Sequence, residues 1–214
     1  MSEARIARCR LYGFIDTAYV GGSDPGEVTR QLIAGGADII QVRAKKNSHA
    51  ECVEIALKVL SAASQHSVPV IINDDIDAAF ETGADGVHLG QEDWSRLGGR
   101  AERVDRLANM RIVGLSTHSL EQALAAERDG ADYIGVGPVF ATDTKPGMKP
   151  VGVALVREVA VRVRIPFFAI GGITLDNIHQ VFGAGATRVA VVSAILKAPD
   201  VANATTAFKK RLED

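Results

Sequence analysis

AGGADIIQV at residues 34–42 is the stretch that decides the fold, because close copies of it recur along the chain. The copies are ETGADGVHL at 81–89, RDGADYIGV at 128–136 and GAGATRVAV at 183–191, the last with Thr in place of Asp. In each copy a Gly stands where a helix C-cap requires the left-handed conformation, and a strand-like apolar run follows at once. These glycines are Gly36, Gly83, Gly130 and Gly185. The repeat predicts helix-to-strand units joined by tight turns.

Further strand-like runs lie between the copies. The complete set of eight begins near Leu11, Ile39, Val70, Val87, Ile112, Ile134, Phe167 and Val189. Helix patterns alternate with these runs at 25–34, 49–64, 75–82, 120–129, 153–163, 175–183 and 201–212, with Asp24 and Ser119 as candidate N-caps. The strands are rich in Val and Ile with little alternation, which is typical of a parallel sheet buried under helices.

Eight β-α units in 214 residues favour an α/β fold of one domain, a (β/α)8 TIM barrel over residues 1–214 with 1–10 as an N-terminal segment. A doubly wound sheet is the alternative, because periodicity alone cannot prove that the sheet closes.

The composition is that of an ordinary globular protein, with 47% hydrophobic residues, 23% charged residues and a net charge of −2. The near-neutral balance argues against a nucleic-acid-binding surface, which would need clustered Lys and Arg. Cys9 and Cys52 give no disulfide framework and no ligand cluster, and they are typical of a reducing cytosol. No run has the length of a membrane span or the character of a signal core. We therefore expect a cytoplasmic protein that binds neither nucleic acid nor membrane.

Most of the strand-like runs end on residues whose side chains can act in catalysis or bind ligands. They include Gln41, Arg43, Lys45, Asn73, Asp74, Gln91, Asp93, Ser116, Thr142, Thr144, Lys145 and Ser193. Such residues gathered at one end of many buried parallel strands are typical of the catalytic rim of a barrel enzyme. The alternative is that polar residues simply mark where strands leave the core. This would explain scattered Ser, Asn and Gly, but it would not explain two acids, an Arg and two Lys at the same end of the strands. The pattern predicts an enzyme.

Three of these residues, Gln41, Arg43 and Lys45, alternate along the second strand and should point to one side. Unpaired buried charge is costly, and the outer face of the strand lies under helices. Ligand binding is therefore the better account, with Arg43 suited to bidentate phosphate contacts and Lys45 supplying a mobile point charge.

Asp74 and Asp93 end adjacent strands of the pattern at the same rim. Mg²⁺ is typically held by one or two carboxylates together with waters and substrate phosphate oxygens. Two aspartates facing a set of cations therefore suggest a metal-bridged polyphosphate. The alternative is that each carboxylate caps the helix that follows it, and the residues alone leave both interpretations open.

Two other regions predict phosphate binding. The loop GPVFATDTKPG at 137–147 is dense in donors, and Thr142, Thr144 and Lys145 form a candidate anion site. Gly171-Gly172 and Val192-Ser193 end the seventh and eighth strands, each leading into a helix, and barrels commonly bind phosphate there. We assign no catalytic role to His88, interpreted as a core histidine, or to His118, interpreted as a helix-capping residue.

The segments IIQVRAK, IIND, ADGVHLGQED, GLSTHS, YIGVGPVFATDTKPG, AIGGI and VVSAI, in this order, resemble the thiamine-phosphate synthase (thiamine-phosphate pyrophosphorylase) family. The resemblance runs from Leu11 to about Phe208. It implies a TIM barrel that uses Mg²⁺ to join 4-amino-2-methyl-5-hydroxymethylpyrimidine diphosphate to hydroxyethylthiazole phosphate. Pyrophosphate leaves, and the thiazole nitrogen attacks the methylene carbon to give thiamine phosphate.

The resemblance also implies the site residues. The pyrimidine diphosphate site would comprise Gln41, Val42, Arg43, Ala44, Lys45, Asn73, Ser116 and Lys145, of which Arg43, Lys45, Ser116 and Lys145 would be catalytic. The thiazole phosphate site would comprise Thr142, Asp143, Thr144, Gly172, Val192 and Ser193. Asp74 and Asp93 would be the magnesium ligands. The first strand, LYGFIDTAYVGG, and Trp94 depart from the family pattern near the expected entrance.

Two alternatives stay open. The thiazole tautomerase branch of the same fold tends to lack the lysine of strand two and the magnesium aspartates, and has a histidine where Pro138 stands here. A non-catalytic sensor of thiamine phosphates would have no need to keep Lys145 together with both aspartates. The expected partners are small-molecule substrates, and a homo-oligomer stays open.

Overall fold

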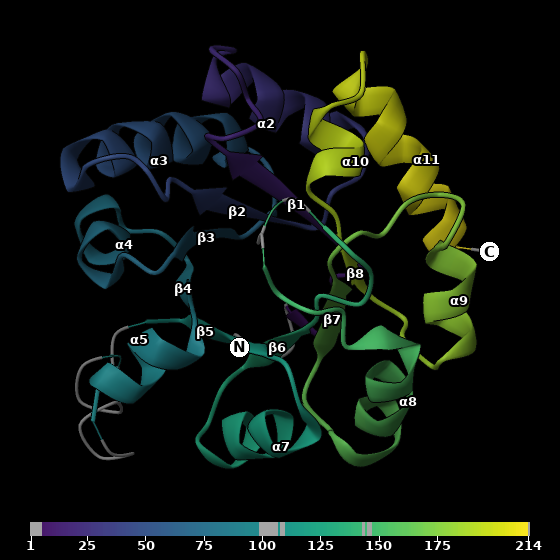
Figure 1. Cartoon of the computed structure of the whole chain (residues 1–214). Coiled ribbons are helices and arrows are strands. Elements are labelled where there is room, and N and C mark those ends of the chain that lie inside the picture. The colour runs from purple at the N-terminus through teal and green to yellow at the C-terminus, as the bar shows by residue number, and fades with distance from the viewer. Residues whose placement is uncertain (1–5, 99–106, 108–109, 143, 145–146, 214) are drawn as a thin grey trace.

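The barrel closes. The computed structural model describes residues 6–98, 107, 110–142, 144 and 147–213. In this part of the chain, eight parallel strands pair in chain order from β1 to β8, and β1 pairs with β8. Figure 1 shows the ring of strands enclosed by helices. The predicted TIM barrel is confirmed, and the doubly wound sheet is wrong because the first and last strands are hydrogen-bonded to each other.

The element bounds follow the predicted alternation closely. The strands are β1 (Leu11–Asp16), β2 (Ile39–Arg43), β3 (Val70–Asn73), β4 (Gly86–Leu89), β5 (Ile112–Thr117), β6 (Tyr133–Val136), β7 (Phe167–Ile170) and β8 (Val189–Ala190). The helices include α2 (Pro25–Ala34), α3 (His49–Ala63), α4 (Ile76–Thr82), α5 (Gln91–Arg96), α7 (Leu120–Arg128), α8 (Gly152–Arg162), α9 (Ile178–Gly183), α10 (Ser193–Leu196) and α11 (Val201–Glu213).

Local hydrogen bonds set where the helices begin. The side chains of Asp24 and Ser119 cap α2 and α7, as the sequence predicts. Helix α9 begins at Ile178 rather than at 175, because the residues before it form a turn. In that turn Asn177 accepts a hydrogen bond from the Thr174 backbone at 2.8 Å and donates one to the Gly172 carbonyl at 2.8 Å.

The Gly-Ala-Asp repeat lies at the amino-terminal ends of the strands and links neighbouring strands there. Its four glycines have φ values of 92°, 69°, 89° and 96°, as the C-cap prediction requires. The three aspartates of the repeat accept backbone hydrogen bonds at the beginning of the preceding strand. The pairs are Asp38 with Leu11 (2.9 Å), Asp85 with Val70 (3.0 Å) and Asp132 with Val113 (2.7 Å). The repeat therefore fixes both the turn into each strand and the neighbour of that strand.

An aromatic cluster occupies the barrel interior. The ring of Tyr12 lies 5.1 Å from that of Phe14 and 5.2 Å from that of Phe168, measured between centroids. Tyr133 packs edge-on against Phe168 at 5.6 Å. Offset and edge-to-face contacts of this kind stabilise a core beyond the area that they bury. Among the described helices, none is long and apolar enough to cross a membrane.

Candidate active site

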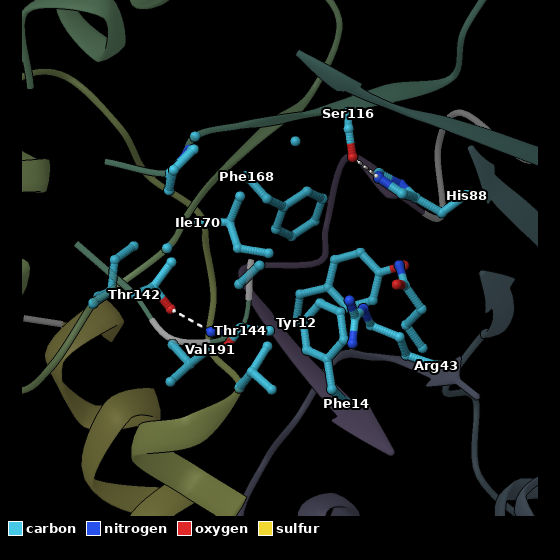
Figure 2. Close-up of a pocket in the computed structure, with 18 of the residues that line it drawn as sticks. Tyr12, Phe14, Arg43, His88, Ser116, Thr142, Thr144, Phe168, Ile170 and Val191 are labelled. Atoms are coloured by element: carbon cyan, nitrogen blue, oxygen red, sulfur yellow. Dashed lines mark hydrogen bonds between the residues drawn. The ribbon is translucent and has the colours of Figure 1, made fainter. Parts of the chain in front are cut away.

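A pocket lies at the carboxyl ends of the strands and collects most of the predicted site residues. Those that line it are Gln41, Arg43, Asn73, Ser116, Thr142, Thr144, Gly172, Val192 and Ser193. Figure 2 shows Arg43 beside Tyr12 and Phe14, with Thr142 and Thr144 across the pocket from it. Arg43 and Thr142, which are 99 residues apart in the sequence, therefore line one cavity.

Arg43 has a buried partner that the sequence did not suggest. Its guanidinium donates to the carboxylate of Asp16 at 2.8 Å, and the side chains are 13% and 1% exposed. The expectation that Arg43 has no structural partner is therefore wrong. Asp16 also accepts from the Ala18 backbone at 3.0 Å. Asp16 is the last residue of LYGFID, so the same rule of polar strand ends could have identified it.

A second pocket adjoins the first and is lined by the Lys45 and Asp74 side chains. Its lining includes Ala44, Lys45, Asn73 and Asp74, and Asn73 lines both pockets. Lys45 lies in the turn after β2 and not on the strand, so it does not share the face of Gln41 and Arg43. It forms an ion pair with Asp74, which also accepts from the amide of Asn73 at 2.7 Å. Asp74 has a φ of 64°, which is uncommon outside glycine.

Asp93 lies in the first turn of α5 and not at a strand end, because that helix begins directly at Gln91. Its side chain is 34% exposed and pairs with Arg96 at 3.1 Å. A carboxylate oxygen of Asp93 lies 3.5 Å from where a β-carbon on Gly90 would stand, so the side chain turns back toward the end of β4. The Asp74 backbone N–H donates to the His88 carbonyl of β4 at 2.9 Å. The two acids thus follow neighbouring strands, but only Asp74 comes directly after its strand.

A series of hydrogen-bonded polar side chains, four of them buried, crosses the barrel and lines the pocket. Gln41 donates to the Tyr12 hydroxyl at 2.9 Å, and the hydroxyls of Tyr12 and Tyr133 are 2.8 Å apart. The His88 Nδ1 lies 3.0 Å from Tyr133, and its Nε2 lies 2.9 Å from the Ser116 hydroxyl, the contact drawn in Figure 2. Burial raises the pKa of Tyr12 and of Tyr133 well above the ordinary range of a phenol.

His88 is the hydrogen-bonded core histidine that the sequence predicts, yet it also lines the pocket. His118 lines the pocket too, and its ring donates to the Gly137 carbonyl. Its backbone N–H donates to the side chain of Gln122 in the first turn of α7 at 2.7 Å. The N-cap of α7 is Ser119, so the interpretation of His118 as a helix-capping residue is wrong: only its backbone N–H reaches that helix. The two tyrosines sit in apolar runs, so the sequence carried no signal that marked them as site residues.

The far side of the pocket is built from three loops. The Thr144 backbone donates to the Thr142 hydroxyl at 3.2 Å, and the Tyr19 hydroxyl lies 3.1 Å from that of Thr144. Gly172 has a φ of 64°, and a β-carbon there would stand 2.4 Å from the Ala141 carbonyl oxygen. Only glycine therefore lets these two loops approach so closely.

The prediction that both Gly-rich strand ends lead straight into helices is wrong in one case. Gly172 is followed by the turn that precedes α9, and only Ser193 begins a helix, the four-residue α10. Phosphate binding on this side would therefore depend on loop backbone and hydroxyl groups more than on a helix dipole.

Several predicted residues do not line the main pocket. Val42 is fully buried and alternates with Gln41 and Arg43, so its side chain faces the helix layer. Ala44 and Lys45 line the second pocket, and Asp93 lies on α5. Asp143 and Lys145 lie outside the residues that the structure describes.

Several known proteins are similar to this chain in sequence and in fold. A family model described as thiamine monophosphate synthase matches residues 11–195. The thiamine-phosphate synthase of Halalkalibacterium halodurans is 42% identical over 205 residues, which cover 95% of this chain and 95% of that protein. The thiamine-phosphate synthase of Thermus thermophilus is 45% identical over 186 residues, 86% of this chain and 87% of that protein. The solved structure of thiamine phosphate pyrophosphorylase from Pyrococcus furiosus matches this fold with a TM-score of 0.84 at 34% identity. The match covers 99% of this chain and 97% of that chain.

Proposed function

The chain belongs to the thiamine monophosphate synthase family, and from this premise we propose that it couples pyrimidine methyl diphosphate to hydroxyethylthiazole phosphate. The products would be thiamine phosphate and pyrophosphate. The observation that carries the proposal is the shared pocket: Gln41, Arg43 and Ser116 line one side of it, and Thr144, Gly172 and Ser193 line the other. One cavity thus offers groups for two phosphorylated substrates.

The pyrimidine diphosphate occupies the side formed by β2, β3 and β5. Asp16 takes one guanidinium nitrogen of Arg43, and among the described residues the other nitrogens have no hydrogen-bond partner. Those nitrogens supply a fork for a diphosphate. Lys45 adds a charge from the adjoining pocket, and Ser116 adds a hydroxyl. Lys145, which lies outside the described residues, is assigned to the same diphosphate by the family motif alone.

The carboxylates of Asp74 and Asp93 are oxygen donors, which suit a hard divalent cation such as Mg²⁺. The described residues contain no group of three or more His, Cys, Asp and Glu that could enclose a metal by themselves. Asp74 and Asp93, on neighbouring segments after β3 and β4, would instead hold Mg²⁺ with the diphosphate and waters completing its ligands. Bound there, the ion would withdraw charge from the leaving pyrophosphate. Each carboxylate forms an ion pair with a cation, Asp74 with Lys45 and Asp93 with Arg96.

The reaction requires the protein to stabilise the leaving pyrophosphate and to position the thiazole nitrogen as the nucleophile. The C–O bond of the pyrimidine methylene breaks, and its electron pair leaves with pyrophosphate. Arg43 and Lys45 neutralise the charge that grows on the departing oxygen, and Ser116 donates a hydrogen bond to it. The aminopyrimidine spreads the positive charge left on the methylene, and the thiazole nitrogen lone pair then forms the C–N bond. No general base is needed, so positioning supplies the rest of the rate.

Replacing Ser193 with Asp should selectively weaken the thiazole phosphate. Ser193 lines the side of the pocket that we assign to this dianion, and a carboxylate there would repel it. We expect the dissociation constant for thiazole phosphate to rise on the order of 10²-fold. Calorimetric titration with each substrate measures this. Ser193→Ala is the matched control, which removes the hydroxyl without adding charge and should cause a much smaller loss. Equal loss of both substrates would show that Ser193 does not belong to the thiazole half.

The principal alternative is a thiazole tautomerase. Pro138 lines the pocket and has no titratable group, so it cannot shuttle the proton that tautomerisation requires. A monophosphate substrate would also give no role to Arg43, Lys45 and the two acids together. Product analysis tests the proposal, because incubation with both substrates and Mg²⁺ should yield thiamine phosphate. Isomerised thiazole without any coupled product would establish the tautomerase, and binding without turnover would establish a sensor.

A further inference from the structure

We infer that Tyr133 is a positioning residue that acts through His88 to hold the Ser116 hydroxyl as a hydrogen-bond donor toward the departing pyrophosphate. The inference rests on the proposed function for the identity of the acceptor. Its structural part, the direction in which the hydrogen bonds run, does not depend on any substrate.

The hydrogen bonds form one unbroken series from β2 to β5. It runs from the Gln41 amide to Tyr12, then to Tyr133, then to His88 and finally to Ser116, with separations of 2.9, 2.8, 3.0 and 2.9 Å. Every member except Ser116 is at most 8% exposed, so water cannot readily replace one of the contacts. We call these five side chains the polar relay.

The direction of the series follows from its first member. The Gln41 amide nitrogen can only donate, so the Tyr12 oxygen accepts. Burial keeps Tyr12 and Tyr133 in the neutral form because it raises both pKa values, and each phenol therefore has one hydrogen to donate. The partner left for the Tyr12 hydrogen among the described residues is the Tyr133 oxygen. A buried hydroxyl hydrogen without an acceptor is costly, which disfavours the reverse direction.

The same reasoning fixes the histidine tautomer. Tyr133 accepts from Tyr12 and so donates to the Nδ1 of His88. A neutral imidazole that accepts at Nδ1 carries its hydrogen on Nε2, and this hydrogen goes to the Ser116 oxygen. The Ser116 hydroxyl then has its own hydrogen free to point into the pocket that it lines. At the other end of the relay, the Gln41 amide oxygen is left to accept.

The relay therefore sets the polarity of two pocket positions. One is an acceptor at Gln41, which suits the amino group of the pyrimidine, and the other is a donor at Ser116, which suits a phosphate oxygen. The relay achieves this with neutral groups only. A carboxylate in the place of either phenol would orient His88 as well, but it would add negative charge close to the diphosphate and oppose its binding.

The tautomer can be measured directly on the chain without substrates. Histidine labelled with ¹⁵N gives separate NMR signals for Nδ1 and Nε2, and the His88 signal is identified by its absence in His88→Gln. We expect His88 to be a single Nε2–H tautomer in the natural protein and a mixture of tautomers in Tyr133→Phe. An Nδ1–H tautomer in the natural protein would overturn the inference, even if Tyr133→Phe failed to fold.

Kinetics give a second and independent readout. Tyr133→Phe should lower kcat roughly tenfold, the effect of one lost hydrogen bond in the site, with KM for thiazole phosphate unchanged. Ser116→Ala should lower kcat at least as much, and the double variant should lose no further kcat, because Tyr133 acts on the departing pyrophosphate through Ser116. Losses that multiply in the double variant would show that Tyr133 acts by another route.

Tyr19 provides the matched control, since Tyr19→Phe also removes one phenol hydroxyl but lies outside the relay, against Thr144. It should leave the His88 tautomer intact, and any kinetic effect should fall on the KM for thiazole phosphate. Loss of the tautomer in Tyr19→Phe would mean that the signal reports general loosening and not the relay. If the natural protein formed no thiamine phosphate, the proposed function would fail while the tautomer result stood.

Discussion

Replacing Arg43 with Met is expected to abolish most of the coupling activity and to destabilise the fold at the same time. The carboxylate of Asp16 is 1% exposed, and Arg43 is its cation at 2.8 Å. Removing one partner of a buried ion pair leaves an uncompensated charge and costs about 3–5 kcal/mol of unfolding free energy. The site also loses a donor that stabilises the leaving group, which should reduce kcat on the order of 10²- to 10³-fold. Urea unfolding and initial rates measure the two effects.

A double variant separates the structural effect from the chemical one. Asp16→Asn combined with Arg43→Met removes the unpaired charge, and the Asn oxygen can still accept from the Ala18 backbone as Asp16 does. We expect this variant to recover most of the stability and none of the activity. Recovery of the activity together with the stability would mean that Arg43 serves the fold alone and does not contact the diphosphate.

Asp74→Asn should cause the second large loss, on the order of 10²-fold in coupling at limiting Mg²⁺, because it removes one carboxylate ligand from the proposed metal site. The substitution is chosen for its backbone: Asp74 has a φ of 64°, and Asn tolerates this left-handed conformation better than most other residues. The fold should therefore stay intact. Coupling rates over a series of Mg²⁺ concentrations should show that the variant needs more metal.

Asp75→Asn is the control for Asp74→Asn. It also removes one carboxylate at the start of α4, but Asp75 serves as the N-cap of that helix, and Asn is an equally good cap. The metal dependence of Asp75→Asn should match that of the natural protein. Should Asp74→Asn turn over normally at limiting Mg²⁺, Asp74 is no metal ligand, and its ion pair with Lys45 is its whole role.

Local signals in the sequence predict the barrel well. The left-handed glycines of the repeat, such as Gly36 and Gly83, mark each helix end because few other residues accept that backbone conformation. The rule that catalytic side chains gather at strand carboxyl ends located Arg43 and Ser116 in the pocket. Both patterns lie within a short segment of sequence, so they predict structure without any information about tertiary contacts.

The errors arise where a contact joins distant segments or where an element boundary moves by a residue or two. Lys45 was placed on β2, but the strand ends at Arg43 and the lysine turns away to Asp74. Tyr12 and Tyr133 are 121 residues apart in apolar runs, and only closure of the barrel brings their hydroxyls together. Asp16 likewise finds Arg43 only because β1 and β2 pair in a particular register. A single sequence carries no direct signal for such pairs.

The most direct test of the proposed coupling is the amount of pyrophosphate released for each thiamine phosphate formed, measured with and without thiazole phosphate at saturating Mg²⁺. A coupling enzyme should release one pyrophosphate for every thiamine phosphate, and omission of either the thiazole phosphate or the metal should abolish thiamine phosphate formation. Pyrophosphate release at the same rate without thiazole phosphate, or isomerisation of the thiazole with no pyrophosphate at all, would contradict the account.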